Sequence, residues 1–112
     1  MTTRTRALGV IAAALGVAGG ANLAGAEAVK REFEHFGYPE DVRVLVGAIE
    51  VGVAATACAG LLVPAAQRVA GVGALCAMAG AFASHTRVGD PLLKRTPAVV
   101  VAAAALVVLA GR

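Results

Sequence analysis

The stretch ALGVIAAALGVAGGANLAGA, residues 7–26, contains no charged side chain. A straight α-helical crossing of a bilayer needs about 20 residues of this kind. Three further apolar runs follow at 44–66, 69–84 and 96–111, and their only charged residue is Glu50. The last two runs are short, but their helices can extend into the polar residues beside them. The sequence therefore predicts four membrane-crossing helices.

The overall composition agrees with this interpretation. The chain has 112 residues, of which 59% are hydrophobic and 15% charged, and its mean hydropathy is +0.80. Soluble domains average about 45–50% apolar and about 25% charged residues. A domain this small has too little interior to bury such an apolar excess. Lipid must cover the remainder, which makes this an integral membrane protein.

The basic residues indicate lipid head groups as the partner. The formal net charge is +3, and the Lys and Arg side chains lie in small groups between the apolar runs. Such flanking groups face the membrane surface. Nucleic acid is not an expected partner, because the chain has no Trp and only 4% aromatic residues for stacking on bases. Two cysteines, Cys58 and Cys76, lie inside apolar runs and predict small buried side chains rather than a disulfide framework.

The fold class is predicted as all-α, a four-helix membrane bundle in a single transmembrane domain spanning residues 1–112. The expected helices are 6–36, 39–63, 67–86 and 92–110, and Gly37 and Pro39 end the first of them. Because the connections are short, consecutive helices are expected to be antiparallel neighbours. An alternative is that residues 1–26 form a signal peptide with a small-residue cleavage site at 24–26, which would leave three crossings.

Small residues recur at four-residue spacing in the first three helices. Such stripes let helix backbones approach closely inside a membrane. The glycines expected to make helix–helix contacts are Gly16 and Gly20 in the first helix and Gly52 and Gly60 in the second. An Ala/Gly-rich chain also produces some stripes by chance, but three stripes in three helices favour a compact bundle.

Nearly all polar chemistry collects at one end of the predicted bundle. Four alternating helices place segments 27–43 and 86–95 on one side of the membrane, and both termini on the other. The polar side holds more Lys and Arg residues, which favours the cytoplasm, whereas Arg4 and Arg6 beside the first helix favour the opposite orientation. The orientation therefore stays open.

Glu50 is the leading candidate site residue. It lies about 12 Å along its helix from Val42, at 1.5 Å per residue, and thus below the interface. An acid at this depth is costly and normally faces the bundle interior. Lys30 and His85 have the depth needed to meet it, and Tyr38, Arg43 and Arg87 are candidate supporting residues. Glu50 is interpreted either as an interhelical clamp or as a protonatable site for a quinone, a proton or another small ligand.

Other chemistry has little support. No second His or Cys stands at metal spacing beside His85, so a metal site is not predicted. The chain has no glycine-rich phosphate loop and no nucleophile elbow. No catalytic residue is assigned.

Several short motifs resemble the DoxX-like membrane proteins, in matching order and spacing over about residues 7–110: AVK (28–30), FGYP (36–39), GAIE (47–50), LLVP (61–64) and GAFASHTRVGD (80–90). The resemblance implies a four-helix protein of the bacterial plasma membrane, with Lys30, Glu50 and His85 on the family's polar positions. It also implies a link with quinone-coupled sulfur oxidation and membrane redox complexes. The soluble redox domain that stands beside some members is missing here, so independent enzymatic activity is not expected.

Three functions remain open at this point. The first is an accessory subunit that binds a lipidic or quinone-like ligand for a membrane redox partner, with quinone as the only suggested cofactor. The second is a proton-coupled small transporter. The third is a non-catalytic structural or assembly factor, whose small-residue stripes bind partner helices or a second copy of the chain.

Overall fold

The computed structural model describes residues 1–111, and Arg112 lies outside the described part. The described residues form five α-helices and no strand. Their bounds are α1 Thr3–Ala24, α2 Glu27–Phe36, α3 Glu40–Gly60, α4 Pro64–Arg87 and α5 Leu92–Ala110. All except α2 are long and apolar enough to cross a membrane. The protein is therefore an all-α membrane bundle with four candidate crossings.

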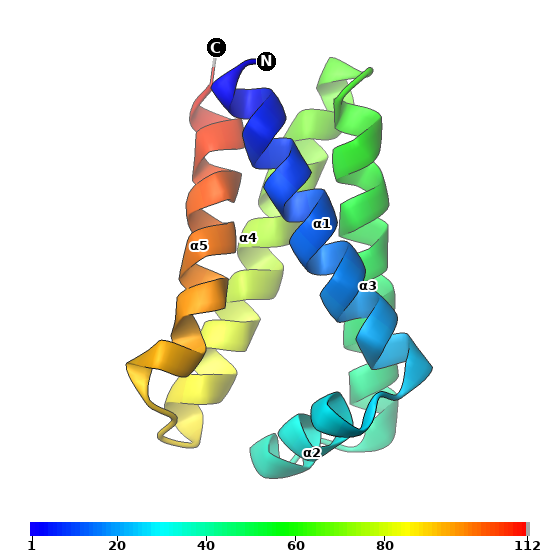
Figure 1. The fold of residues 1–112 in the computed structure, drawn as a ribbon, viewed down its shortest axis with the longest axis vertical. Helices are drawn as coiled ribbons and strands as arrows, with labels where there is room; N and C mark the ends of the chain where they lie inside the picture. The colour runs from blue at the N-terminus through cyan, green and yellow to red at the C-terminus, as the bar shows by residue number, and fades with distance from the viewer. Residues whose placement is uncertain (112) are drawn as a thin grey trace.

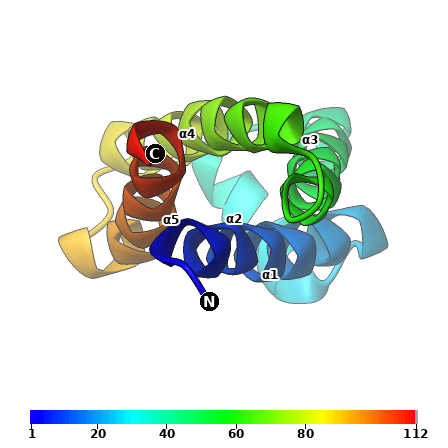
Figure 2. The same cartoon turned by 90° about the horizontal axis from the view of Figure 1, so that it is seen from above.

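The four long helices surround a common core (Figure 2). Helix α1 packs against α3 and α5, and α4 packs against the same two helices on the other side. The N-terminus and the α3–α4 turn lie at one end, and α2 and the α4–α5 turn lie at the other (Figure 1). The longest extent of the molecule is 40 Å, which exceeds the roughly 30 Å of a bilayer's hydrocarbon core.

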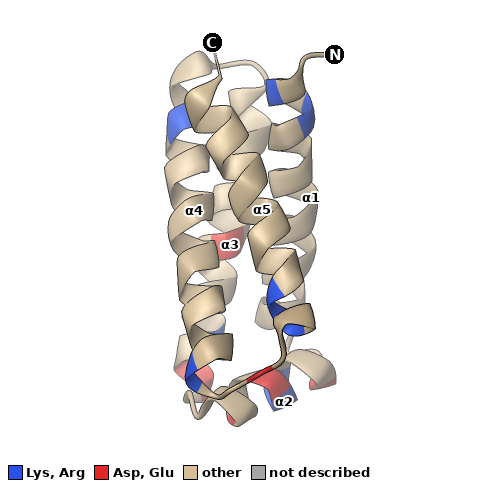
Figure 3. Cartoon of the chain, turned by 90° about the vertical axis from the view of Figure 1, so that its left-hand side faces the viewer, with Lys and Arg blue, Asp and Glu red and all other residues tan. Residues whose placement is uncertain are grey.

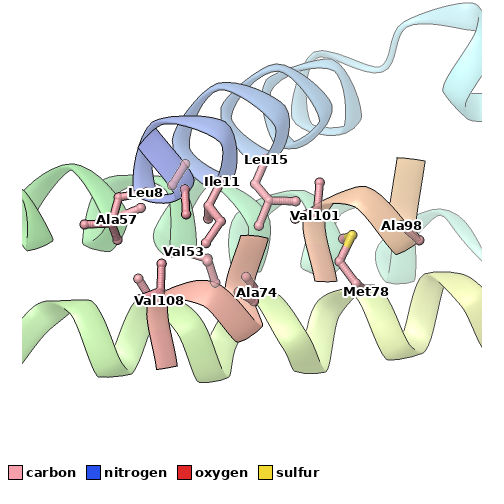
Figure 4. Close-up of a cluster of buried hydrophobic side chains, with 14 residues drawn as sticks. Leu8, Ile11, Leu15, Val53, Ala57, Ala74, Met78, Ala98, Val101 and Val108 are labelled. Carbon is pink, nitrogen blue, oxygen red and sulfur yellow. The ribbon is translucent and has the colours of Figure 1, made fainter. Parts of the chain in front are cut away.

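The core consists of small and branched aliphatic side chains. Its largest fully buried members are Leu8, Ile11 and Leu15, all from α1. Figure 4 shows them beside Val101 and Val108 of α5, with alanines of α3 and α4 completing the cluster. The many alanines allow the helices to approach closely. Close packing matters in a membrane, because the hydrophobic effect does not drive helices together in lipid.

The outer surface is apolar as well. Large hydrophobic side chains such as Val17, Leu62 and Leu93 are exposed, as expected of surfaces that face lipid. Cys58 and Cys76 are both free and exposed, so the prediction that they are buried was wrong. In a membrane protein, residues that face lipid are as apolar as residues of the core. An apolar run therefore does not show which of its residues are buried.

The first predicted helix is not continuous, which corrects the expected range 6–36. Gly25 adopts a left-handed conformation with φ of 72° and ends α1. Its N–H and that of Ala26 both donate to the carbonyl of Ala21, at 3.1 Å each. This glycine cap ends the helix, and α2 then runs across the end of the bundle instead of projecting beyond it (Figure 1).

The turn between the second and third crossings also differs from the expected one. Helix α3 ends at Gly60 rather than at 63, and α4 begins at Pro64 rather than at 67. Proline fits the first turn of a helix because its missing N–H would be unpaired there anyway. The side-chain amide of Gln67 donates to the Gly60 carbonyl at 2.8 Å and fastens this turn.

Helices α1 and α3 cross at a pair of glycines that the stripe analysis missed. A Cβ atom at Gly19 would lie 2.9 Å from the Gly47 carbonyl, and one at Gly47 would lie 2.9 Å from the Asn22 Cβ. By contrast, Gly20 and Gly52 face open space, so their assignment as contact residues was wrong. A helix has 3.6 residues per turn, and a stripe at strict four-residue spacing therefore drifts off the contact face.

The other two glycines of the predicted set behave differently. A Cβ at Gly16 would lie 3.7 Å from Ala54 of α3, which is ordinary contact between α1 and α3. Gly60 lies against Gln67 within the α3–α4 turn, where a Cβ would come within 3.2 Å of the Gln67 Cγ. Gly60 thus serves the turn rather than a contact between two crossings.

Candidate functional site

The main pocket has a volume of about 670 Å³ and lies among α1, α2, α3 and α4, toward the polar end. Ligand sites for small molecules commonly measure 300–1,000 Å³ and are mostly apolar with a few polar groups. This pocket follows that pattern. Its lining consists of Ala18, Asn22, Val29, Glu32, Phe33, Phe36, Tyr38, Val42, Val46, Ile49, Glu50, Cys76, Ala77, Gly80, Ala81, Ala83, Ser84, His85 and Arg87.

Glu50 stands on the pocket wall within the span of α3. Its side chain is 7% exposed, and the acidic position part-way along α3 in Figure 3 stands apart from the charges at the two ends. Its Oε1 accepts a hydrogen bond from Asn22 Nδ2 at 2.6 Å. Asn22 lies on α1, directly beside the Gly19–Gly47 crossing. The close approach of two helices therefore brings a buried amide to a buried acid.

Lys30 does not meet Glu50, contrary to the sequence expectation. Its side chain lies against Gly25, where a Cβ would be 3.0 Å from the Lys30 Cε. Lys30 lines a second, smaller pocket of about 270 Å³, together with Glu34, Glu40 and Arg43 among others. The break at Gly25 is the cause, because it turns α2 and its lysine away from the depth of Glu50.

Arg43 supports the inner end of the site through the backbone. It is buried, donates to the carbonyl of Asn22, and donates to Glu40 at 2.9 Å. The carbonyl of Asn22 is one of the last of α1, and along the backbone it accepts only a 3.3 Å hydrogen bond from the N–H of Gly25, which that N–H shares with Ala21. Arg43 thus ties the end of α1 to the start of α3 and holds Asn22 in place.

His85 lies at the outer part of the pocket, where Asp90 organises the polar side chains. Asp90 is buried, and its two carboxylate oxygens meet His85 Nδ1 at 2.6 Å and His35 Nε2 at 2.7 Å. These two hydrogen bonds, that with His85 first, hold the pKa of Asp90 below its usual range. Lys94 Nζ adds a positive charge at 4.0 Å.

Aromatic rings close the pocket beside this cluster. The Phe36 and His85 rings meet edge to face with centroids 5.0 Å apart. The Tyr38 hydroxyl lies 2.9 Å from the Ser84 hydroxyl, and the Arg87 guanidinium lies 4.9 Å from the Tyr38 ring centre. The hydrogen bond with Ser84, and then the guanidinium, lower the pKa of Tyr38. Arg87 also donates to the carbonyl of Phe36, so α4 holds the end of α2.

Three of these side chains also have the spacing of a loose cation site. Glu32, His85 and Asp90 each offer one ligand atom, and these atoms lie within 4.8 Å of one another. The sequence spacing around His85 does not show this group, since Glu32 comes from a different helix, far from His85 in the chain. Both Asp90 oxygens already accept from imidazoles, and we therefore assign the group to hydrogen bonding.

The structure thus divides the predicted site residues. Glu50, His85, Tyr38 and Arg87 line one pocket, whereas Arg43 supports it from behind and Lys30 lies outside it. Sequence reasoning missed Asn22, Asp90 and His35. For Asn22 the sequence did contain a signal, because it is the only amide side chain in the otherwise apolar run 7–26.

Chemically, the arrangement offers a hydrophobic chamber with polar groups at different depths. Glu50 supplies a carboxyl group within the membrane span, and His85 supplies an imidazole whose ring is fixed by Asp90. Such a chamber can hold a largely apolar ring or tail while its polar groups fix the orientation of a head.

Comparison with known proteins identifies the family. Residues 7–110 match the DoxX-like family, and this match covers all four candidate crossings almost entirely. Neither the comparison with curated proteins nor that with solved structures gave a match. With nearly the whole length matched, the chain is a multi-pass membrane protein that belongs to the DoxX-like family.

Proposed function

We propose that this protein is an accessory subunit of the bacterial plasma membrane that binds a quinone-like lipidic ligand and serves a membrane redox partner. The observation that carries the proposal is the 670 Å³ pocket with Glu50 on its wall. The link with quinone chemistry that the DoxX-like resemblance implies supports the choice of ligand class.

Several features of the pocket suit such a ligand. Its lining is mainly Ala, Val, Ile and Phe, which favours a ring and tail that also partition into lipid. The lining residues on α2 cover it at the polar end, and Glu50 lies deeper along α3. A head group entering the pocket would therefore meet polar side chains at two depths.

Filling the pocket tests the proposal. Ala81 lines the main pocket, whereas Ala79 lies two residues away on α4 and does not. In lipid nanodiscs, the Ala81→Trp variant is expected to bind a short-tailed benzoquinone at least tenfold more weakly than the unmodified protein. Ala79→Trp is the matched control and is expected to bind normally. No saturable binding by the unmodified protein would refute the proposal.

A structural role for Glu50 has support from a different observation. Its hydrogen bond with Asn22 joins α1 and α3 where their backbones approach most closely, at Gly19 and Gly47. If Glu50 were only a clamp between α1 and α3, Glu50→Gln would change the yield or stability of the protein and leave benzoquinone binding unchanged. Proton-driven transport in vesicles that disappears in Glu50→Gln would instead support a transporter.

A further inference from the structure

The main pocket is covered by α2 at the polar end of the bundle, but part of its lining lies on the outer surface of the crossings. We propose that the pocket opens sideways to lipid between α3 and α4, and that its ligand enters there and leaves its hydrocarbon tail in the opening. This inference rests on the proposed function. It adds the route of entry, the leaflet and the class of ligand, which is a head group with a long apolar tail.

The exposed part of the pocket lining lies on two neighbouring helices. Among the described lining residues, those that are exposed come from α3 and α4: Ile49, Cys76, Gly80, Ala83 and Arg87. Arg87 is the last residue of α4, whereas the other four are uncharged and lie deeper in the crossings. A lining residue that is also exposed marks the rim of an opening. Because this rim lies within the candidate crossings, the opening faces lipid.

Two contacts between α3 and α4 frame the opening at its ends. Toward the α3–α4 turn, a Cβ at Gly73 would lie 2.9 Å from the Val53 Cγ2, so the two helices touch there. Toward the polar end, the hydroxyls of Tyr38, just before α3, and Ser84 of α4 lie 2.9 Å apart. The interval from Gly73 to Ser84 corresponds to about 16 Å along α4, at 1.5 Å per residue. Figure 1 shows that α4 leans away from α3 over this interval.

The polar end of the pocket, by contrast, is covered. The four lining residues on α2 are buried or half-buried. Hydrogen bonds attach this helix to the bundle, since His35 meets Asp90 at 2.7 Å and the Phe36 carbonyl accepts from Arg87. A ligand arriving from water would have to displace this cover, whereas a ligand dissolved in lipid meets the opening directly.

The position of the opening also selects a leaflet and a ligand shape. The lining residues of α3 lie between 42 and 50 and those of α4 between 76 and 87, which are the halves of both helices nearest α2. The opening therefore faces the leaflet on the α2 side. Gly80 and Ala83 on its rim are small and leave room for a hydrocarbon chain to pass. A ligand with its head in the pocket and its tail in this leaflet keeps the apolar tail out of water.

The test compares two benzoquinones with the same head group, one with a short tail and one with a long isoprenoid tail, bound to the full chain in nanodiscs. With ligand concentrations expressed per lipid, the long-tailed compound is expected to bind within threefold of the short-tailed one, or more tightly, because its tail leaves through the opening. Binding of the long-tailed compound that is more than threefold weaker overturns the inference and leaves the proposed function standing. If neither compound binds, the proposed function fails.

Plugging the rim locates the tail. Gly80 and Gly20 are both exposed glycines within a crossing, where an added Cβ would meet nothing within 4 Å, but Gly80 lines the pocket and Gly20 does not. Gly80→Trp is expected to weaken binding of the long-tailed compound at least tenfold relative to the short-tailed one. The matched control Gly20→Trp is expected to keep the ratio of the unmodified protein.

A smaller plug on the same rim, Ala83→Leu, should shift this ratio in the same direction and decides the question if Gly80→Trp does not fold. A ratio that stays unchanged in the folded rim variants contradicts an opening between α3 and α4.

Discussion

At the scale of single residues, two glycines and one amide determine the inner end of the site. Gly19 and Gly47 permit α1 and α3 to approach so closely that added Cβ atoms would fall within 2.9 Å of the neighbouring helix. Asn22 lies one turn further along α1 and reaches Glu50. The helix crossing and the buried polar pair are therefore one feature, and a change in the crossing should disturb the pair.

Gly19→Ala should destabilise the protein. The new methyl would lie 2.8 Å from the Val51 backbone nitrogen and 2.9 Å from the Gly47 carbonyl, so backbone must move. Overpacking of this kind costs about 1–3 kcal/mol. Gly20→Ala faces open space and should be neutral or gain up to about 1 kcal/mol of helix propensity. Unfolding by sodium dodecyl sulfate, followed by circular dichroism, measures both. Equal stability of the two variants would contradict the crossing.

At the scale of elements, α2 is held to the bundle by polar contacts at its C-terminal half. His35 bonds to Asp90 in the α4–α5 turn, and the carbonyl of Phe36 accepts from Arg87. Phe36 is the buried residue of this helix. Because α2 supplies four residues of the pocket lining, these contacts also complete the pocket.

The Asp90 contacts predict a dependence of stability on acid. The pKa of Asp90 is lowered by its bonds to His85 and His35, so the folded state favours the ionised carboxylate. This contribution is complete above the unfolded value of about 3.9 and is lost as pH falls through the lowered folded pKa. Unfolding free energies between about pH 6 and pH 2 should therefore decline less for Asp90→Asn than for the unmodified protein.

Asp41→Asn is the control for this experiment, since Asp41 is exposed in the first turn of α3. It should retain the acid dependence of the unmodified chain. If Asp90→Asn and Asp41→Asn gave the same pH profile, the Asp90 contacts would not carry the effect.

The elements also show how far the sequence alone leads. The lengths of the apolar runs predicted the four crossings, because each helix that crosses lipid must itself be long and mostly apolar. The break at Gly25 was missed, since a glycine inside an apolar run can continue a helix or cap it. The contact between Asp90 and His35 was missed because these residues are 55 positions apart in the chain, and nothing in local spacing encodes which polar side chains meet at the end of a bundle.

For Glu50, the sequence predicted the burial of the side chain but not its hydrogen-bond partner. Its cost within a membrane predicted that it would face the interior, and it lies buried on the pocket wall. Lys30 and His85 were expected to meet it, but its hydrogen bond is with Asn22. The expectation for Lys30 was wrong because it depended on the depth of a helix that in fact ends at Ala24.

At the scale of the whole molecule, the four crossings predict which segments lie on the same side of the membrane. Arg31 on α2 and Gly89 in the α4–α5 turn lie at one end, and Arg68 near the start of α4 lies at the other. Single cysteines at these three exposed positions, with Cys58 and Cys76 replaced by Ala, can be labelled by an impermeant maleimide in oriented vesicles. Positions 31 and 89 should react from the same side, and position 68 from the opposite side. Labelling of all three from one side would contradict four crossings.

The most direct test of the proposed function is to locate the bound ligand by photolabelling. A short-tailed quinone with an azide on its ring, irradiated with the protein in nanodiscs, should attach within segments 29–38 and 76–87, which line the pocket. Excess unlabelled ligand should abolish this attachment. None of the described residues of α5 lines the pocket, so α5 should remain unlabelled. Attachment spread over α5 and the lipid-facing surfaces, undiminished by competitor, would contradict a ligand site at Glu50.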